Sequence, residues 1–176
     1  MGVGGNGATG RSDFVHWISV PTRWRDMDAM RHVNSAVYFT YLEAARMEYF
    51  RGAGLHTFKI DRKEGPAVVS QTCNYRQQVF HPVVLEIGTR LIELKEKTFT
   101  VEYEAYFEGT DTLVCDGSTT MAWVDLERAR SIPLPDALRK AIEEYEGRAD
   151  GSGAGSGGPL APHGLGEKLG RDATAV

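Results

Sequence analysis

Apolar residues recur at helical spacing from residue 34 to about residue 52. One wide arc of this segment carries Val37, Tyr38, Tyr41, Leu42, Ala44, Ala45 and Tyr49, and the opposite side carries Thr40, Glu43 and Arg46. Spacing of this kind predicts a mostly buried helix. Asn34 or Ser35 can cap its start, and Gly52 or Gly54 can end it. We therefore expect one long central helix.

After this helix the apolar period changes to two, which is typical of strands with one buried face. The alternation is clearest in 98–107 and also appears in 67–76, 83–94 and 112–124, and an earlier strand is expected at about 14–24. The connections at 80–82 and 108–111 are too short for parallel crossovers. We therefore expect the strands on either side of each to be antiparallel neighbours.

A second, amphipathic helix is predicted at about 135–146, with Pro135 and Asp136 at its start. This order of elements favours an α+β domain in which a curved antiparallel sheet of about five strands wraps the central helix. We assign the domain to residues 13–147. Residues 1–12 are expected to be a flexible arm and residues 148–176 a disordered Gly-rich tail.

One layer of sheet over one helix leaves a sheet edge and an outer face that need cover. Oligomers commonly supply such cover by symmetric pairing. We therefore expect a homodimer or a dimer of dimers.

Composition narrows the possible classes of function. The 176 residues carry a formal net charge of -4, with 41% hydrophobic and 25% charged residues, so the basic excess of a nucleic-acid-binding protein is missing. Two cysteines, Cys73 and Cys115, form no disulfide framework or metal knuckle, which favours a cytoplasmic location. No apolar run has the length of a signal-peptide core or a membrane span.

Polar groups that could do chemistry gather between the first strand and the central helix. Asp26, Asp28 and His32 lie there, close to a helix start whose free N–H groups and positive dipole end can hold an oxyanion. A nearby carboxylate could act as base or nucleophile. The same residue types are typical of turns and helix caps. Spacing alone leaves both roles open and does not distinguish Asp26 from Asp28.

Other chemistries have little support in the sequence. A calcium loop starting at Asp26 would place Met30 at a ligand position and Arg31 where glycine makes the turn, and the five histidines form no HxxxH pair. No GxSxG elbow, phosphate-binding loop or GxGxxG motif after a strand is present. Both cysteines lie in predicted strands, where core residues are more usual than nucleophiles. We therefore expect no metal and no cofactor.

The same segment and the helix after it form a longer pattern. It consists of Asp26, Asp28, His32, Val33 and Asn34, followed by Tyr38, Tyr41, Glu43, Ala45 and Arg46. This resembles the hot-dog-fold acyl-CoA thioesterases of the 4-hydroxybenzoyl-CoA thioesterase type, whose signature is roughly Asp-x-Asp-x-x-Gly-His-Val-Asn-Asn before a helix with Tyr, Tyr-x-Glu and Ala-Arg. The likeness continues to residues 131–138. It implies the hot-dog fold.

The resemblance implies a role for each polar residue. Asp28 would be the catalytic carboxylate, either attacking the thioester carbonyl or activating water. The backbone N–H of Ser35 would hold the thioester oxygen. His32 and Asn34 would orient these groups or hydrogen-bond the loop, and Asp26 would be structural.

It also implies an acyl-CoA substrate whose pantetheine arm lies between subunits. Lys97, and more weakly Lys95, would contact the nucleotide of coenzyme A. Tyr38 would help to shape the acyl pocket, which depends on the side chains that point inward among Tyr38, Tyr41, Phe58 and Trp123.

Two positions depart from the family signature. Arg31 stands where glycine is usual, and Ser35 stands where a second asparagine is common. If the glycine serves a positive φ, Arg31 is strained by roughly 1 kcal/mol or the loop takes another path. On an unaltered loop, Arg31 would place a cation within reach of Asp28 and could meet an anionic group of the substrate.

The expected activity is hydrolysis of acyl-CoA thioesters to a free acid and coenzyme A. Two alternatives stay open, because a fold does not determine a function. One is a thioesterase for acyl-carrier-protein substrates, and the other is a non-catalytic hot-dog subunit that binds acyl-CoA.

Overall fold

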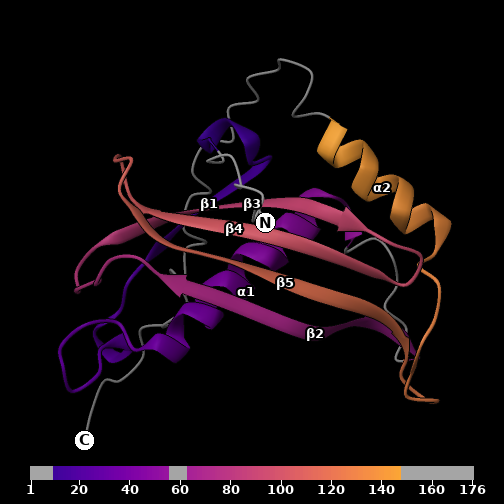
Figure 1. Ribbon diagram of the computed structural model, residues 1–176, viewed down its shortest axis with the longest axis horizontal. Helices are drawn as coiled ribbons and strands as arrows, with labels where there is room; N and C mark the ends of the chain where they lie inside the picture. The colour runs from indigo at the N-terminus through magenta and orange to yellow at the C-terminus, as the bar shows by residue number, and fades with distance from the viewer. Residues whose placement is uncertain (1–9, 56–62, 148–176) are drawn as a thin grey trace, which may run out of the picture.

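The computed structural model describes residues 10–55 and 63–147 (Figure 1). Its strands are β1 (His16–Pro21), β2 (Glu64–Tyr75), β3 (Val84–Leu94), β4 (Thr98–Phe107), β5 (Leu113–Asp125) and β6 (Arg130–Ser131), and its helices are α1 (Ser35–Gly52) and α2 (Asp136–Gly147). Every predicted strand and both predicted helices are present. The predicted tail and Phe58 lie outside the described residues. Within the described part of the chain, no helix is long and apolar enough to cross a membrane.

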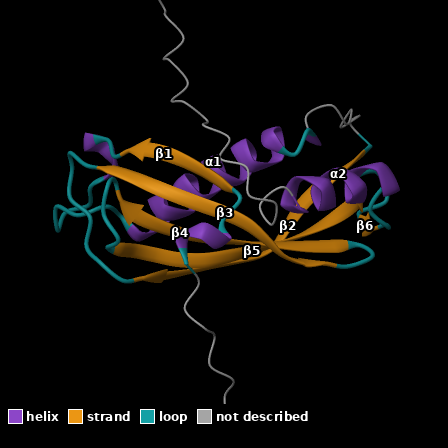
Figure 2. Cartoon of the chain, turned by 90° about the horizontal axis from the view of Figure 1, so that it is seen from above, coloured by secondary structure: helices purple, strands orange, loops and turns teal. Residues whose placement is uncertain are grey.

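One antiparallel sheet curls around α1 (Figures 1 and 2). Its strand order is β1-β3-β4-β5-β2, and β6 pairs with β5. The long central helix therefore lies in the hollow of the sheet, and α2 follows as the C-terminal helix. This confirms the expected α+β architecture.

One expected strand pairing is wrong. We expected the strands around residues 80–82 to be neighbours, but β2 pairs with β5, and both β4 and β5 lie between β2 and β3. The connecting segment crosses one end of the curled sheet, where Val79 is fully buried and its carbonyl accepts a hydrogen bond from the N–H of Val33 (2.8 Å). So short a connection can pass two strands because the sheet is curled around α1 and not flat.

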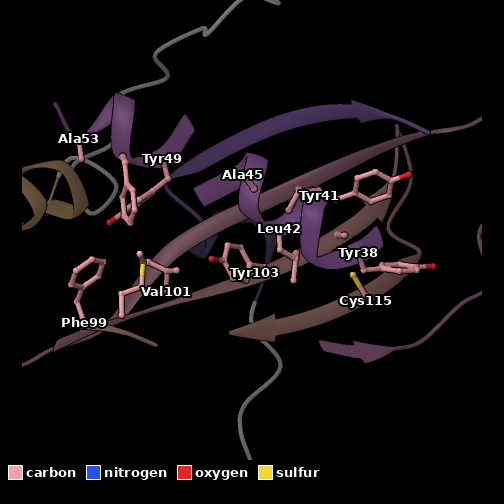
Figure 3. Close-up of a cluster of buried hydrophobic side chains, with 14 of the residues drawn as sticks. Tyr38, Tyr41, Leu42, Ala45, Tyr49, Ala53, Phe99, Val101, Tyr103 and Cys115 are labelled. Atoms are coloured by element: carbon pink, nitrogen blue, oxygen red, sulfur yellow. The ribbon is translucent and has the colours of Figure 1, made fainter. Parts of the chain in front are cut away.

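α1 supplies a large share of the core. Figure 3 shows Tyr38, Tyr41, Leu42, Ala45 and Tyr49 of α1 together with Phe99, Val101, Tyr103 and Cys115 of the sheet. Cys115 is buried and Cys73 is half-buried, and both are free thiols. Most of the predicted apolar arc of α1 therefore packs against the sheet, as its spacing predicted. Ala44, which the pattern placed on this arc, is instead exposed.

Arg46 does not lie on the outer side of α1, where the apolar pattern placed it. Its side chain is buried, with 4% exposed. Arg46 stands one turn from Leu42 and from Phe50, which are both buried, whereas Thr40 and Glu43 are exposed as predicted. The buried arc of α1 is therefore turned towards Arg46 and away from Ala44, because the curled sheet and not the apolar pattern alone decides which side is covered.

Part of the predicted N-terminal arm contacts the sheet. The guanidinium of Arg11 lies over the rings of Trp17 and Tyr106, 4.5 and 4.7 Å from their centroids. It also pairs with Glu86 at 2.6 Å. These contacts attach residues 10–13 to the outer surface of the domain.

Candidate active site

The loop that precedes α1 folds back on itself. Met27 and Val33 form an isolated antiparallel bridge. Inside it, the N–H of Asp28 donates to the carbonyl of His32 and the N–H of Arg31 donates to the carbonyl of Asp28, both at 3.0 Å. Arg31 has a φ of 67°, in the left-handed region that favours glycine. The loop therefore keeps the path that a glycine would adopt, and Arg31 bears the strain.

Asp26 lies at the base of this loop and is buried, with 2% exposed. Its carboxylate accepts hydrogen bonds from the N–H and the Nε–H of Arg23 (2.8 and 3.1 Å) and from the hydroxyl of Tyr41 (2.6 Å). Burial raises the pKa of Asp26, but these hydrogen bonds and the charge of Arg23 outweigh burial, and the net pKa is lowered. Asp26 is thus fully engaged in holding the loop to α1.

Asp28 occupies the outer part of the loop, and 24% of its side chain is exposed. Its Oδ1 accepts a hydrogen bond from the N–H of Met30 (2.8 Å), and its Oδ2 lies 3.4 Å from Nδ1 of His32. The imidazole of His32 also packs edge-on against Phe80, with ring centroids 6.5 Å apart. Arg31 is exposed and forms no ion pair within residues 10–55 and 63–147. The ionisable side chain beside Asp28 is therefore His32.

The first turn of α1 begins beside this loop. Asn34 caps the helix, because its side-chain oxygen accepts a hydrogen bond from the N–H of Ala36 (2.9 Å). Ser35 is exposed, and none of the described residues accepts a hydrogen bond from its N–H. The first turn therefore presents a free donor at the positive end of the helix dipole.

Two tyrosines stand next to this donor. The hydroxyl of Tyr75 donates to the carbonyl of Ser35 (2.9 Å), and the ring of Tyr75 meets that of Tyr38 in a T-shaped contact with centroids 5.0 Å apart. Burial raises the pKa of Tyr38, with smaller contributions from Cys115 and Cys73. Sequence reasoning missed Tyr75 because only the packing of the end of β2 against α1 brings it to this place.

Lys95 and Lys97 lie at the other end of the sheet. Both are exposed in the turn between β3 and β4, and the carbonyl of Lys97 accepts a hydrogen bond from the N–H of Trp123 (2.9 Å). Trp123 is opposite Pro66 near the start of β2, whereas Tyr75 at the end of β2 marks the α1 start. The nine residue steps from Pro66 to Tyr75 span about 30 Å.

One chain therefore brings together only some of the predicted site residues. Those that share the start of α1 are Asp28, Arg31, His32, Asn34, Ser35 and Tyr38. The two lysines do not join them within the same chain.

A cavity of about 540 Å³ opens beside the C-terminal half of α1. Its lining consists of Glu43, Arg46, Met47, Phe50, Arg51, Leu55, Gly65, Pro66, Val68, Met121, Trp123, Leu126 and Leu138. The walls are mainly apolar, and the volume suits a small organic ligand. Arg46 was missed as a lining residue, although its spacing of four from Leu42 and from Phe50 could have placed it on the buried side.

Metal ligands are not grouped in the part of the chain that the structure describes. No cluster of three or more His, Cys, Asp or Glu side chains suited to a metal ion occurs there. The expectation that the protein needs no metal and no cofactor stays a prediction.

Comparisons with known proteins identify the family. The family model described as the thioesterase-like superfamily matches residues 22–142. The chain belongs to this superfamily. The long-chain acyl-CoA thioesterase FadM of Escherichia coli (strain K12) is 25% identical over 125 residues, which cover 71% of this chain and 95% of FadM.

Solved structures of other proteins agree in fold. The PA2801 protein from Pseudomonas aeruginosa has 31% sequence identity and a TM-score of 0.66, over 73% of this chain and 98% of that chain. A thioesterase from Thermus thermophilus, complexed with coenzyme A and Zn, has 26% identity and a TM-score of 0.66, over 77% of this chain and 98% of that chain.

The thioesterase-like match spans the loop before α1, the whole of α1 and the strands from β2 to β6. Membership confirms the expectation of an enzyme of the thioester hydrolase class. The narrower 4-hydroxybenzoyl-CoA thioesterase type stays a prediction.

Proposed function

We propose that the protein hydrolyses acyl-CoA thioesters to a free acid and coenzyme A, with Asp28 as base or nucleophile and the Ser35 N–H as oxyanion donor. The main support is the presence, at one helix start, of a partly exposed carboxylate and a backbone N–H that no described residue uses. A thioester is already an activated acyl group. One carboxylate and a polarising helix end can therefore suffice without a catalytic triad.

In the proposed reaction the thioester oxygen accepts a hydrogen bond from the N–H of Ser35. Asp28 either removes a proton from a water molecule that attacks the carbonyl carbon, or attacks this carbon itself to form an anhydride that water then hydrolyses. The C–S bond breaks in both routes, and the departing thiolate of coenzyme A takes up a proton. His32 would hold the Asp28 carboxylate in place, and Asn34 would maintain the first helical turn.

We also propose that the enzyme works as a homodimer, alone or within a dimer of dimers, formed through the free edge of β2. Tyr75 at one end of β2 contacts the α1 start, and Gly65 and Pro66 at the other end line the cavity. Antiparallel pairing of two copies about a point near Ser70 would set the Tyr75 end of one strand against the Gly65 end of the other. The site of one subunit would then face the cavity of its partner.

The same pairing would give the two lysines a role. Within one chain Lys95 and Lys97 lie near the cavity end of β2, far from Asp28. In the proposed dimer they would approach the partner's site, where their charges and that of Arg31 could meet the phosphates of coenzyme A. A cytoplasmic location belongs to this proposal, since the two cysteines are free thiols.

Release of free thiol from a panel of acyl-CoA substrates tests the activity. We expect Asp28→Asn to lower kcat by a factor of about 10² to 10⁴. Asp111→Asn is the matched control, because it makes the same change in the exposed hairpin between β4 and β5. Protein without substrate is the blank, because the half-buried Cys73 can react with a thiol reagent. Equal turnover by wild type and Asp28→Asn would exclude Asp28 as the catalytic carboxylate.

The same panel separates the alternatives. Faster release from an acyl-carrier protein than from coenzyme A, with the same acyl group on both, would identify a carrier-protein thioesterase. Tight acyl-CoA binding by wild type with no thiol release would identify a binding subunit and contradict the proposal.

A further inference from the structure

Arg46 is a cation buried in the wall of the cavity. Only 4% of the residue is exposed, and its guanidinium forms no ion pair with any described carboxylate. Its Nη1 lies 3.4 Å from the hydroxyl of Tyr103 and 3.4 Å from the hydroxyl of Thr119, and both are long contacts. Its Nε–H has no hydrogen-bond partner among the described residues.

The two neighbouring hydroxyls cannot balance this charge. Both are neutral, and the Thr119 hydroxyl also accepts a hydrogen bond from Nε2 of Gln71 (3.1 Å). A buried guanidinium without a counter-charge is unfavourable, because folding removes its hydration and puts no opposite charge in its place. An acceptor that reached Arg46 from the cavity would therefore gain a charge-assisted hydrogen bond whose desolvation has already taken place in folding.

The rest of the cavity defines what surrounds such an acceptor. Phe50, Leu55, Met121, Trp123 and Leu138 give it apolar walls, and its volume is about 540 Å³. The other charged lining residues, Glu43 and Arg51, are exposed, and Arg51 pairs with Glu48 at 3.2 Å. An apolar chain can fill this space. The combination of apolar walls with one buried, unpaired cation matches an aliphatic chain that ends in a carboxylate.

We propose that this cavity binds an apolar chain ending in a carboxylate, with Arg46 as the residue that recognises the carboxylate. The inference rests on the proposed function in one respect, since that function makes the ligand the acyl part of a thioester. The substrate class would then be acyl-CoA with a second carboxylate at the far end of the acyl chain. The carboxylate could alternatively be that of a free fatty acid, the product of hydrolysis, which has the same chemistry at Arg46.

Binding to a catalytically silent protein tests the cavity without requiring hydrolysis. In an Asp28→Asn background, calorimetry measures binding of octanoate and of octanedioate. We expect Arg46→Met to weaken binding of both acids at least about tenfold, which corresponds to the loss of one charge-assisted hydrogen bond. Methionine suits the apolar surroundings, and Arg46→Lys keeps the cation in case the first variant does not fold. Arg128→Met is the matched control, because Arg128 is 70% exposed and pairs with Asp125 outside the cavity lining.

Kinetics distinguish the two sources of the carboxylate. If the acyl chain carries it, wild type prefers octanedioyl-CoA to octanoyl-CoA in kcat/KM, Arg46→Lys keeps part of this preference, and Arg46→Met loses it. If the product acid carries it, octanoate inhibits wild type and not Arg46→Met, with no preference for the dioyl substrate. Binding that is equal in wild type, Arg46→Lys and Arg46→Met overturns the proposal. Arg46-dependent binding without any thioester hydrolysis would leave this inference standing and remove the proposed function.

Discussion

Two aspartates two positions apart in the chain have opposite surroundings, and this difference is invisible in the sequence. Asp26 is buried and accepts hydrogen bonds from Arg23 and Tyr41, whereas Asp28 is partly exposed beside His32. The spacing Asp-x-Asp shows only that both belong to one loop. The choice of Asp28 came from the family resemblance, and the buried position of Asp26 gives a physical reason for the same choice.

This difference predicts that the same substitution affects mainly stability at Asp26 and mainly turnover at Asp28. Asp26→Asn should lower the free energy of unfolding by about 2 kcal/mol at neutral pH, because it leaves the donors of Arg23 and Tyr41 poorly satisfied. Asp28→Asn should change it by less than about 0.5 kcal/mol while reducing turnover. Urea unfolding of both variants measures the change in the free energy of unfolding. A larger loss of stability in Asp28→Asn than in Asp26→Asn would contradict the structural role of Asp26.

The Asp26 effect should also depend on pH. The pKa of Asp26 is lower in the folded protein than in the unfolded chain, so the unfolded chain binds the proton more readily. The contribution of Asp26 to stability is therefore complete above the ordinary pKa of an aspartate, about 4. It is lost as the pH falls through the lowered pKa that Asp26 has in the folded protein. Unfolding free energies of wild type and Asp26→Asn should converge below about pH 4 and differ most at neutral pH.

Substitutions of Arg31 test how much the strained backbone of this loop costs in stability. With a φ of 67°, Arg31→Gly should leave stability unchanged or raise it by up to about 1 kcal/mol, because the relief of strain exceeds or offsets the greater freedom of glycine in the unfolded chain. Arg31→Val should lose more than about 1 kcal/mol, since a β-branched residue is poorly tolerated there. Thermal unfolding measures both, and a clear loss of stability in Arg31→Gly would show that the Arg31 side chain stabilises the loop.

At the scale of elements, the spacing of apolar residues predicted the features that depend on interactions between residues close together in the chain. The Asn34 cap and most of the apolar arc of α1 follow from local hydrogen bonds and side-chain spacing. The alternation of β4 predicted the face that packs against α1, but Thr100, Glu104 and Tyr106 on the other face are also buried. The pairing of β2 with β5 could not be predicted, because it depends on how far the sheet curls around α1. The same curvature buries Arg46 and brings Tyr75 to the α1 start, so both residues escaped a prediction based on one element at a time.

The close approach of β2 to β5 can be tested at one glycine. A Cβ added to Gly117 would lie 2.2 Å from the backbone oxygen of Thr72, so Gly117→Ala must push the two strands apart. We expect a loss of about 1 to 3 kcal/mol and faster amide hydrogen exchange along β2. Gly147→Ala is the control, since no described atom lies within 4 Å of its added Cβ. Equal stability of the two variants would mean that β2 adjusts at no cost.

At the scale of the whole molecule, the two edge strands of the sheet differ in how well they are protected from pairing with another chain. β1 has six residues and ends in Pro21, whereas β2 has twelve residues and exposes Val68 and Val69, at 46% and 64%. A long edge strand with exposed apolar side chains is a template for pairing with another chain. The cavity and the α1 start lie at opposite ends of this same strand, so pairing through β2 would join the two halves of the proposed site.

Pairing through β2 predicts a dimer that depends on Val69. Light scattering should give a mass of twice 19.4 kDa, or four times 19.4 kDa for a dimer of dimers. Val69→Lys should shift the protein towards the monomer, because a two-fold axis near the centre of β2 would bring the two lysines close together. Ile92→Lys is the matched control, since Ile92 is 49% exposed on β3, which β4 and β5 separate from β2. If the dimer completes the site, the Val69→Lys monomer also loses thioesterase activity, and the activity recovers at protein concentrations that restore the dimer. A fully active monomer would show instead that Asp28 and the cavity of one chain serve the same substrate without a partner.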